Sequence, residues 1–258
     1  MNVLQITEIQ AFSFLLILAR MSAFLVAWPL LGGINVPAPV KVLLALLLSL
    51  VFFPLLKDSM NLQVIGIAHL IGCVMKEVFV GLCLAFVSYL FFYAIQVGSE
   101  LVATSMGVNA AQIYNPTMSV SMTPVDQFYS IMASLFFLLM NGHHIFLTGL
   151  LHSYDIIPAT RWGLSLESFS QIALIGKEVL IIGFQLSAPV LVSILLINIS
   201  MAIIGRAVPQ MNVLLTSMSV NVLVGIFILI FAIPLIWSEF HQSSEFFMEA
   251  FMGFLKTV

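Results

Sequence analysis

Residues 64–97 read VIGIAHLIGCVMKEVFVGLCLAFVSYLFFYAIQV, an apolar stretch that contains the charged pair Lys76-Glu77. An ion in the hydrocarbon of a membrane costs roughly 2.5–3.5 kcal/mol, so such residues face protein or water rather than lipid. A second pair, Lys177-Glu178, opens another long apolar stretch in the same way. The two stretches therefore predict helices that pack inside a membrane assembly, where their charges find partners.

The composition of the whole chain favours the same class. Of its 258 residues 62% are hydrophobic and only 7% are charged, and the mean hydropathy is +1.17. Soluble domains do not reach such values. The net charge is −3 and the chain has no cluster of Lys or Arg, which argues against a nucleic-acid partner. The sequence thus predicts an all-α membrane protein, and we expect no cleavable signal peptide.

The apolar residues gather in about six blocks, and roughly 20 residues suffice to cross the hydrocarbon core. Two blocks are much longer and would reach about 50 Å as straight helices. We expect these two to tilt, break or extend beyond the bilayer, with Gly81 and Pro189 as the break points. The blocks lie at residues 9–31, 42–56, 64–97, 128–151, 172–204 and 213–237.

Residues 98–125 form the longest connection between blocks and contain no Lys or Arg. A loop of more than about 15 residues without secondary structure is usually functional or disordered, and this one is too apolar for a solvated linker. We expect a folded element that lies inside a cavity, with Glu100 and Asp126 at its borders as anchors. An ordinary connector between helices is the alternative.

The charges inside the apolar blocks are expected to pair between helices. Adjacent residues lie about 100° apart on a helix, so the Lys and Glu of one pair cannot bond each other on one face. A lysine that reaches the membrane edge is the alternative for Lys177, and a proton relay is the alternative for the glutamates. The residues assigned to inter-helix or inter-subunit pairing are Arg20, Lys76, Glu77, Glu100, Lys177, Glu178 and Arg206.

An enzyme is the weakest of the function classes. The best candidate cluster is NGHH at residues 141–144 with His152 and Asp155. The chain has no H-E-x-x-H motif and no other His or Cys pair at ligand spacing, so we interpret these histidines as structural or interfacial. We expect no metal and no cofactor. Cys73 and Cys83 lie in one apolar block about 15 Å apart along a helix, too far for a disulfide.

The C-terminal segment, residues 239–258, alternates aromatic with polar residues. Such a pattern is typical of an amphipathic helix that binds a membrane surface or a partner. The apolar residues of this helix would be Phe240, Phe247, Phe251, Phe254 and Leu255.

Short motifs occur through almost the whole chain. In order they are RMSAFLVAWPLLG at residues 20–32 with Val36-Pro37 and Lys41 behind it, QVGSE at 96–100, Met106-Gly107, Asn115-Pro116, NGHH at 141–144, Ser153 with Pro158, and GRAVPQMNV at 205–213. In this order and at this chain length they resemble the FliR family, the integral export-gate subunits of the bacterial flagellar type III secretion apparatus. The chain departs from the family after Asn212: a Gly-x-Pro and a basic residue are usual there, whereas this chain has Ser219 and Asn221.

The resemblance implies a polytopic fold in which a P-like part precedes a Q-like helical hairpin. The single domain would comprise N-terminal helices at 1–63, the P-like part at 64–160 with a plug loop at 98–125, the hairpin at 171–237 and an amphipathic tail at 239–258. It also implies a non-enzymatic core subunit that forms, with FliP and FliQ, a channel for unfolded proteins across the bacterial inner membrane, and FlhB is expected as a further partner. Part of that assembly would project to the periplasmic side.

In the family the loop at 98–125 corresponds to the plug of the closed channel. Small and flexible apolar side chains suit a plug, because Met adapts its shape to its neighbours and an apolar constriction resists ion flow by dewetting. The residues expected to form the gate and plug are Met106, Gly107, Ala110, Ile113, Tyr114, Asn115, Pro116, Met118 and Met122.

Two other functions remain open. A virulence-type III secretion homologue shares the fold, although the motifs at 141–144 and 206–212 favour the flagellar system. A small-molecule secondary carrier is suggested by the expected helix breaks and by the weak echo between the two Lys-Glu pairs. A carrier would bind a ligand and act alone or as a small homo-oligomer, whereas an export-gate subunit would be recovered with other hydrophobic subunits.

Overall fold

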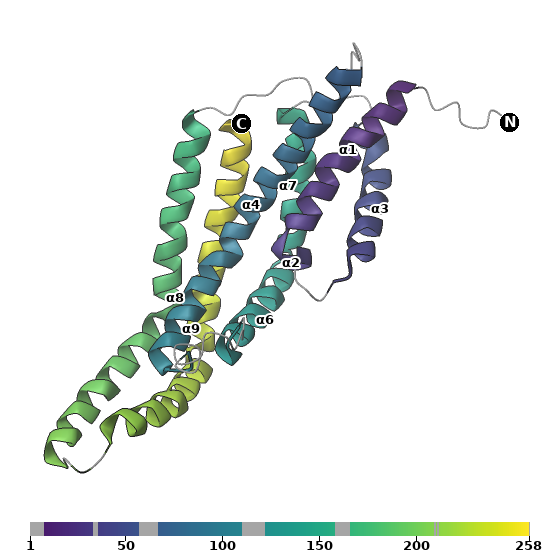
Figure 1. Ribbon diagram of the computed structural model, residues 1–258. Helices are drawn as coiled ribbons and strands as arrows, with labels where there is room; N and C mark the ends of the chain where they lie inside the picture. Colours follow the sequence, from purple (N-terminus) through teal and green to yellow (C-terminus); the bar gives the residue numbers. More distant parts are fainter. Residues whose placement is uncertain are drawn as a thin grey trace. The chain divides into compact units, whose positions relative to one another are not determined.

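The computed structural model describes residues 8–32, 36–56, 67–109, 122–157, 166–208, 210 and 212–257. The regular structure within these ranges is α-helix, without any strand, so the expected all-α class is confirmed (Figure 1). In chain order the helices are α1 (Glu8–Ala27), α2 (Pro29–Gly32), α3 (Ala38–Leu56), α4 (Ile67–Met106), α6 (Pro124–Leu139), α7 (Gly142–Ile156), α8 (Leu166–Ala207) and α9 (Val213–Thr257).

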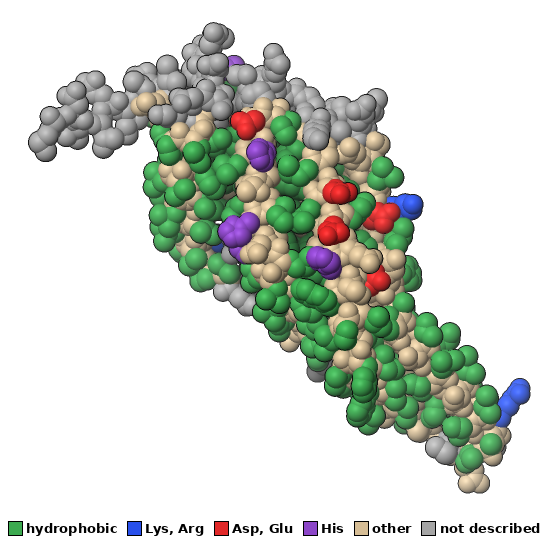
Figure 2. All heavy atoms as spheres, turned by 180° about the vertical axis from the view of Figure 1, so that it is seen from behind, with side chains coloured by type: hydrophobic (Ala, Val, Ile, Leu, Met, Phe, Trp, Pro, Cys, Tyr) green, Lys and Arg blue, Asp and Glu red, His purple; other side chains and the backbone are tan. Residues whose placement is uncertain are grey.

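Five helices are long and apolar enough to cross a membrane, and α6 with α7 would make a sixth if the two count as one broken span. Hydrophobic side chains predominate on the face of the molecule seen in Figure 2. Exposed apolar surface on this scale suits lipid or other apolar proteins rather than water, so the chain is a membrane protein. Examples of large exposed apolar side chains are Val51 and Leu55 on α3, Leu195, Ile199 and Ile203 on α8, and Leu223, Phe227 and Phe231 on α9.

The three longest helices are continuous: α4 has 40 residues, α8 has 42 and α9 has 45. The expected break at Gly81 is therefore wrong. α8 is not interrupted at Pro189, but it changes direction near its middle (Figure 1), as helices that contain proline often do. Gly81 lets α1 approach α4 closely, because a Cβ at this position would lie 2.5 Å from the carbonyl oxygen of Arg20. Pro189 remains inside α8, as proline can in apolar helices whose neighbours satisfy the backbone groups it frees.

The connection after α4 is shorter than the sequence indicated. α4 continues through residues 98–106, which were expected to belong to the loop, and α6 begins at Pro124. Val102 and Met106 on this last part of α4 are buried, and tertiary packing of an apolar face extends a helix beyond what its local sequence favours. Residues 110–121 lie outside the described part of the chain.

The C-terminal segment is the end of α9 rather than a separate surface helix. Its aromatic residues Phe247, Phe251 and Phe254 are buried within the chain, so the expectation that their side chains bind a membrane surface or a partner is wrong. The ring of Phe251 packs on Phe146 of α7, with 4.9 Å between the ring centroids. Gly149 on α7 provides the space, because a Cβ there would collide with the same ring.

The chain divides into two compact units. Unit 1 comprises Met1–Leu90, Asn141–Ile175 and Phe246–Val258, and unit 2 comprises Phe91–Met140 and Gly176–Glu245. In unit 1, α1 packs against α3, and its residues Leu16, Ile17 and Phe24 are buried. In unit 2 an aromatic cluster joins Phe91 to Phe240 and Phe136 to Trp237, with centroid distances of 5.2 and 4.7 Å.

Candidate functional site

A buried ion pair lies at the centre of unit 1. Arg20 on α1 and Glu77 on α4 are each about 1% exposed. The guanidinium donates from Nε to Glu77 Oε2 at 2.5 Å and from Nη2 to Oε1 at 3.0 Å. This two-point geometry is the strongest arrangement of an arginine with a carboxylate, and it fixes the orientation of both side chains.

The remaining donors of Arg20 reach α7. Nη1 donates to Ser153 Oγ and Nη2 to the carbonyl oxygen of Ile157, both at 2.8 Å. The Tyr154 ring covers the guanidinium, with 4.1 Å from Cζ to the ring centroid, and its hydroxyl donates to the Ile17 carbonyl. Arg20 thus joins α1, α4 and α7. Because a buried charge is tolerated only when it is paired and hydrogen-bonded, each of these partners contributes to holding the three helices in place.

The other charges assigned to pairing have no ion-pair partner among the described residues. Lys76 and Glu178 are half-buried, whereas Glu100, Lys177 and Arg206 are exposed. Arg206 lies in the last turn of α8, where a cation interacts favourably with the helix dipole. Within the described ranges, Arg20 and Glu77 are the two of these seven charges that form an ion pair.

The start of the α4–α6 connection is defined by Met106 and Gly107. Met106 is buried, and its side chain occupies a notch at Gly225 on α9, where a Cβ would lie 2.7 Å from Met106 Cε. Gly107 ends α4 with a φ of +77°, a conformation that glycine adopts without strain. The Val108 backbone N–H donates to the Ala103 carbonyl, which closes the last turn.

The end of the connection is defined by a capping box at Thr123. The Thr123 hydroxyl accepts from the backbone N–H of Asp126, and Asp126 accepts from the Thr123 backbone N–H. Asp126 also lies 2.8 Å from the hydroxyl of Ser99 on α4. Met122, just before the cap, is exposed. The remaining residues assigned to the plug lie outside the described ranges: Ala110, Ile113, Tyr114, Asn115, Pro116 and Met118.

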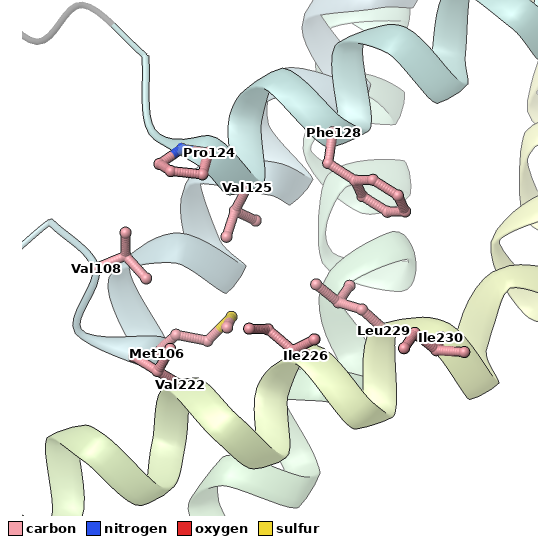
Figure 3. Close-up of a pocket in the computed structure, with 9 residues that line it drawn as sticks. All are labelled: Met106, Val108, Pro124, Val125, Phe128, Val222, Ile226, Leu229 and Ile230. Carbon is pink, nitrogen blue, oxygen red and sulfur yellow. The ribbon is translucent and has the colours of Figure 1, made fainter.

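A cavity of about 360 Å³ lies between the two ends of this connection (Figure 3). Side chains from the end of α4 and the residues just after it, from the start of α6 and from the first half of α9 surround it. Its lining is apolar and flexible enough to accept apolar groups of different shape. The lining residues are Met106, Val108, Pro124, Val125, Phe128, Val222, Ile226, Leu229 and Ile230.

The histidines of the candidate cluster suggested by the sequence lie along α7. The ring centroids of His143 and His144 lie 4.3 Å apart. His152 Nδ1 lies 3.9 Å from Asp155 Oδ2 on the surface of α7. In the described ranges, no group of three His, Cys, Asp or Glu side chains is arranged to hold a metal ion.

The sequence did not identify every residue of the Arg20 site or of the contacts at the start of α6. Tyr154 carries no signal that would place it against Arg20. The pairing of Ser99 with Asp126 also depends on the fold, because the two residues are 27 positions apart. The cap was recognisable, since Thr-x-x-Asp before an apolar run is a capping-box pattern and Pro124 is suited to the first helical position.

Comparison with known proteins identifies the chain's relatives. The family model described as bacterial export proteins, family 1, matches residues 11–246. The flagellar biosynthetic protein FliR of Bacillus subtilis is 32% identical over 87% of each chain. FliR of Caulobacter vibrioides is 27% identical over 90% of this chain and 94% of its own, and FliR of Escherichia coli is 24% identical over 90% of each. The chain therefore belongs to family 1 of the bacterial export proteins, the family of the flagellar biosynthetic protein FliR.

Proposed function

We propose that this chain is a non-enzymatic core subunit of the flagellar type III protein export gate in the bacterial inner membrane. With FliP and FliQ subunits, and with FlhB beside them, it would form the channel for unfolded flagellar proteins, part of which projects to the periplasmic side. The observation that carries this proposal is the family match over residues 11–246, nearly the whole chain, together with relatives named for flagellar biosynthesis.

The surface of the chain supports a subunit rather than a protein that acts alone. Long apolar faces of α8 and α9 are exposed, including Leu196 and Phe231. α4 and α8 carry Lys, Glu and Arg side chains that have no ion-pair partner in the described part of the chain. Ions next to lipid are costly, so neighbouring subunits that offer opposite charges would stabilise these charged side chains. The same subunits would cover the exposed apolar faces. In this proposal Lys76, Glu100, Lys177, Glu178 and Arg206 bond to other subunits.

The connection between α4 and α6 is the proposed plug. At its described ends, Met106 and Met122 have apolar side chains and Gly107 has a positive φ. A cavity lined by apolar residues lies between these ends. An apolar constriction excludes ions by dewetting, while Met side chains adapt to chains of different sequence as they pass. Such a plug would block ions in the closed gate and yield to substrates in the open gate, without any fixed charge.

Deletion of residues 109–118 tests this function. In cells whose flagellar export depends on this chain, we expect the variant complex to assemble, because α4 and α6 keep their caps, and to leak ions when no substrate is in transit. Membrane conductance, flagellar secretion and the amount of assembled complex are measured together. An intact ion barrier with normal export would remove the plug assignment and favour a carrier.

A further inference from the structure

Two asparagine side chains bond to each other between α8 and α9, where these helices of unit 2 approach their connection (Figure 1). Asn221 Nδ2 donates to Asn198 Oδ1 at 3.0 Å. The two residues lie in segments that are long and apolar enough to cross a membrane, Ser170–Ala207 and Leu215–Leu255. Amides in such segments are costly unless they are hydrogen-bonded, so the presence of this pair needs a physical reason.

The bond satisfies only part of the Asn221 amide. Asn221 is 6% exposed, and its Oδ1 is buried without a hydrogen-bond partner in the described part of the chain. An amide oxygen buried in this way costs more than one hydrogen bond between neutral groups returns, and a leucine of similar volume would avoid that cost. A buried asparagine between helices is typical of interfaces that gain a specific register or partner at the expense of stability. The packing of α8 on α9 therefore does not by itself explain Asn221.

Asn198 lies at the boundary between the buried and the exposed side of α8. One turn away on the buried side are Ile194 and Met201, whereas Leu195, on the other side, is 59% exposed. Asn198 itself is exposed. Because Asn221 holds its Oδ1, the Nδ2 of the same planar amide is directed away from that bond, and it has no hydrogen-bond partner among the residues that the structure describes. The exposed side of α8 thus presents one oriented hydrogen-bond donor.

The surface around this donor is apolar. Leu195 and Ile199, its neighbours on α8, are 59% and 50% exposed, and Ala202 one turn further on is exposed as well. Lipid chains would cover the apolar side chains but offer no acceptor to the amide. An apolar helix that carries an Asn, Gln, Ser or Thr side chain satisfies both, because such side chains form hydrogen bonds between membrane helices. The face is therefore complementary to a second membrane helix with one polar side chain.

We propose that Asn198 and Asn221 form a recognition site for another membrane subunit: Asn221 orients the amide of Asn198, and Asn198 donates from Nδ2 to an acceptor side chain on an apolar helix of that subunit. This inference rests on the proposed function, in which the chain is one subunit of a membrane complex. It assigns the amide pair to assembly rather than to the stability of α8 against α9.

Replacement of both asparagines by leucine separates assembly from stability. The double variant Asn198→Leu with Asn221→Leu keeps the side-chain volumes similar and leaves no buried amide unpaired. In detergent we expect it to melt at the temperature of the unsubstituted chain or higher. We also expect about three- to tenfold less of the other membrane subunits to be recovered with the tagged chain, the effect of one lost hydrogen bond between helices. Asn221→Leu alone, which frees the Asn198 amide to rotate, should lower this recovery as well.

Ser200→Leu is the matched control. Ser200 is also exposed on α8, two residues after Asn198, but its hydroxyl donates to the Leu196 carbonyl of its own helix at 2.9 Å. The same replacement there adds an apolar side chain and removes no donor directed outward, so we expect unchanged recovery of the complex. A photo-reactive residue in place of Ile199 identifies the occupant directly, and we expect a cross-link to another protein subunit in the membrane.

The outcomes distinguish the inference from the proposed function. Recovery that is unchanged in the double variant, or lowered equally by Ser200→Leu, overturns the recognition site. The same conclusion follows from a lower melting temperature with a proportional loss of complex, which would mark the pair as structural, and from reaction of the photo-reactive residue with lipid alone. In each of these cases the proposed function stands. If the unsubstituted chain is recovered without any other membrane subunit, the proposed function is overturned together with this inference.

Discussion

At the scale of single residues, Arg20 and Glu77 show how an apolar chain accommodates charge. Both side chains are about 1% exposed, and the guanidinium makes hydrogen bonds to Glu77, Ser153 and Ile157. Removal of one partner from such a pair costs about 3–5 kcal/mol, because the other charge stays buried without compensation. Sequence pattern indicated that both residues were buried ions. It did not pair them, because 57 residues separate the two and only the crossing of α1 and α4 brings them together.

Replacement of Glu77 by Gln tests the energetic role of this pair. The amide has nearly the same volume but leaves Arg20 uncompensated, so we expect a loss of roughly 3–5 kcal/mol in unfolding free energy. The measurement is the thermal stability of the detergent-solubilised chain. Lys76→Gln is the control, since Lys76 is the neighbouring half-buried residue and has no ion-pair partner among the residues described; a change within about 0.5 kcal/mol is expected there. Equal stability of the two variants would contradict the assigned role.

At the scale of elements, the helices of each unit approach one another at glycines. In unit 2, α4 and α8 cross where Gly98 and Gly183 meet: a Cβ at Gly98 would lie 3.0 Å from the Gly183 carbonyl oxygen. In unit 1, Gly81 has the same role between α4 and α1. Small residues of this kind allow close packing of membrane helices, for which the hydrophobic effect between helices is absent. Gly81 was expected to break α4 and instead belongs to a crossing, a distinction that periodicity cannot make.

Replacement of Gly183 by Val should separate α4 from α8. A Cβ at Gly183 would already lie 2.7 Å from Val97 Cγ1 and 3.2 Å from the Ala94 carbonyl oxygen, and overpacking of this kind costs about 1–3 kcal/mol. Gly176→Ala on the same helix is the control, because no described atom lies within 4 Å of a Cβ there. We expect a lower melting temperature in detergent for Gly183→Val and an unchanged or higher one for Gly176→Ala. The same melting temperature in both variants would show that the crossing tolerates a larger separation.

At the scale of the whole molecule, the surface of this chain is largely apolar and carries charges without ion-pair partners among the described residues. Large apolar side chains are exposed on every helix long enough to cross a membrane, and several charged residues lack ion-pair partners in the described ranges. Both features are typical of a subunit whose surface is covered by others. The pairing of Lys76, Lys177 and Glu178 with neighbouring subunits remains a prediction.

Replacement of Glu178 by Gln decides between the two roles considered for this glutamate, subunit bonding and proton relay. If Glu178 bonds to a neighbouring subunit, we expect less assembled complex and a proportional loss of export. An assembled complex that no longer exports would instead support a proton relay. The amount of complex recovered with a tagged neighbouring subunit and the amount of secreted flagellar protein are compared, with the exposed Glu245 on α9 replaced by Gln as the control.

Composition and block length were sufficient for the all-α membrane class, because burial in lipid demands long apolar helices whatever their arrangement. Motif order was sufficient for the family. The helix ends, the ion partners and the place of the C-terminal aromatic residues depended on packing between residues far apart in the chain. The amphipathic pattern that includes Phe251 is the same whether this side chain contacts a membrane or α7. α4 continues past Gly98 because unit 2 buries Val102 and Met106. The local sequence pattern carries no information about contacts between residues far apart in the chain, so only the tertiary structure determines them.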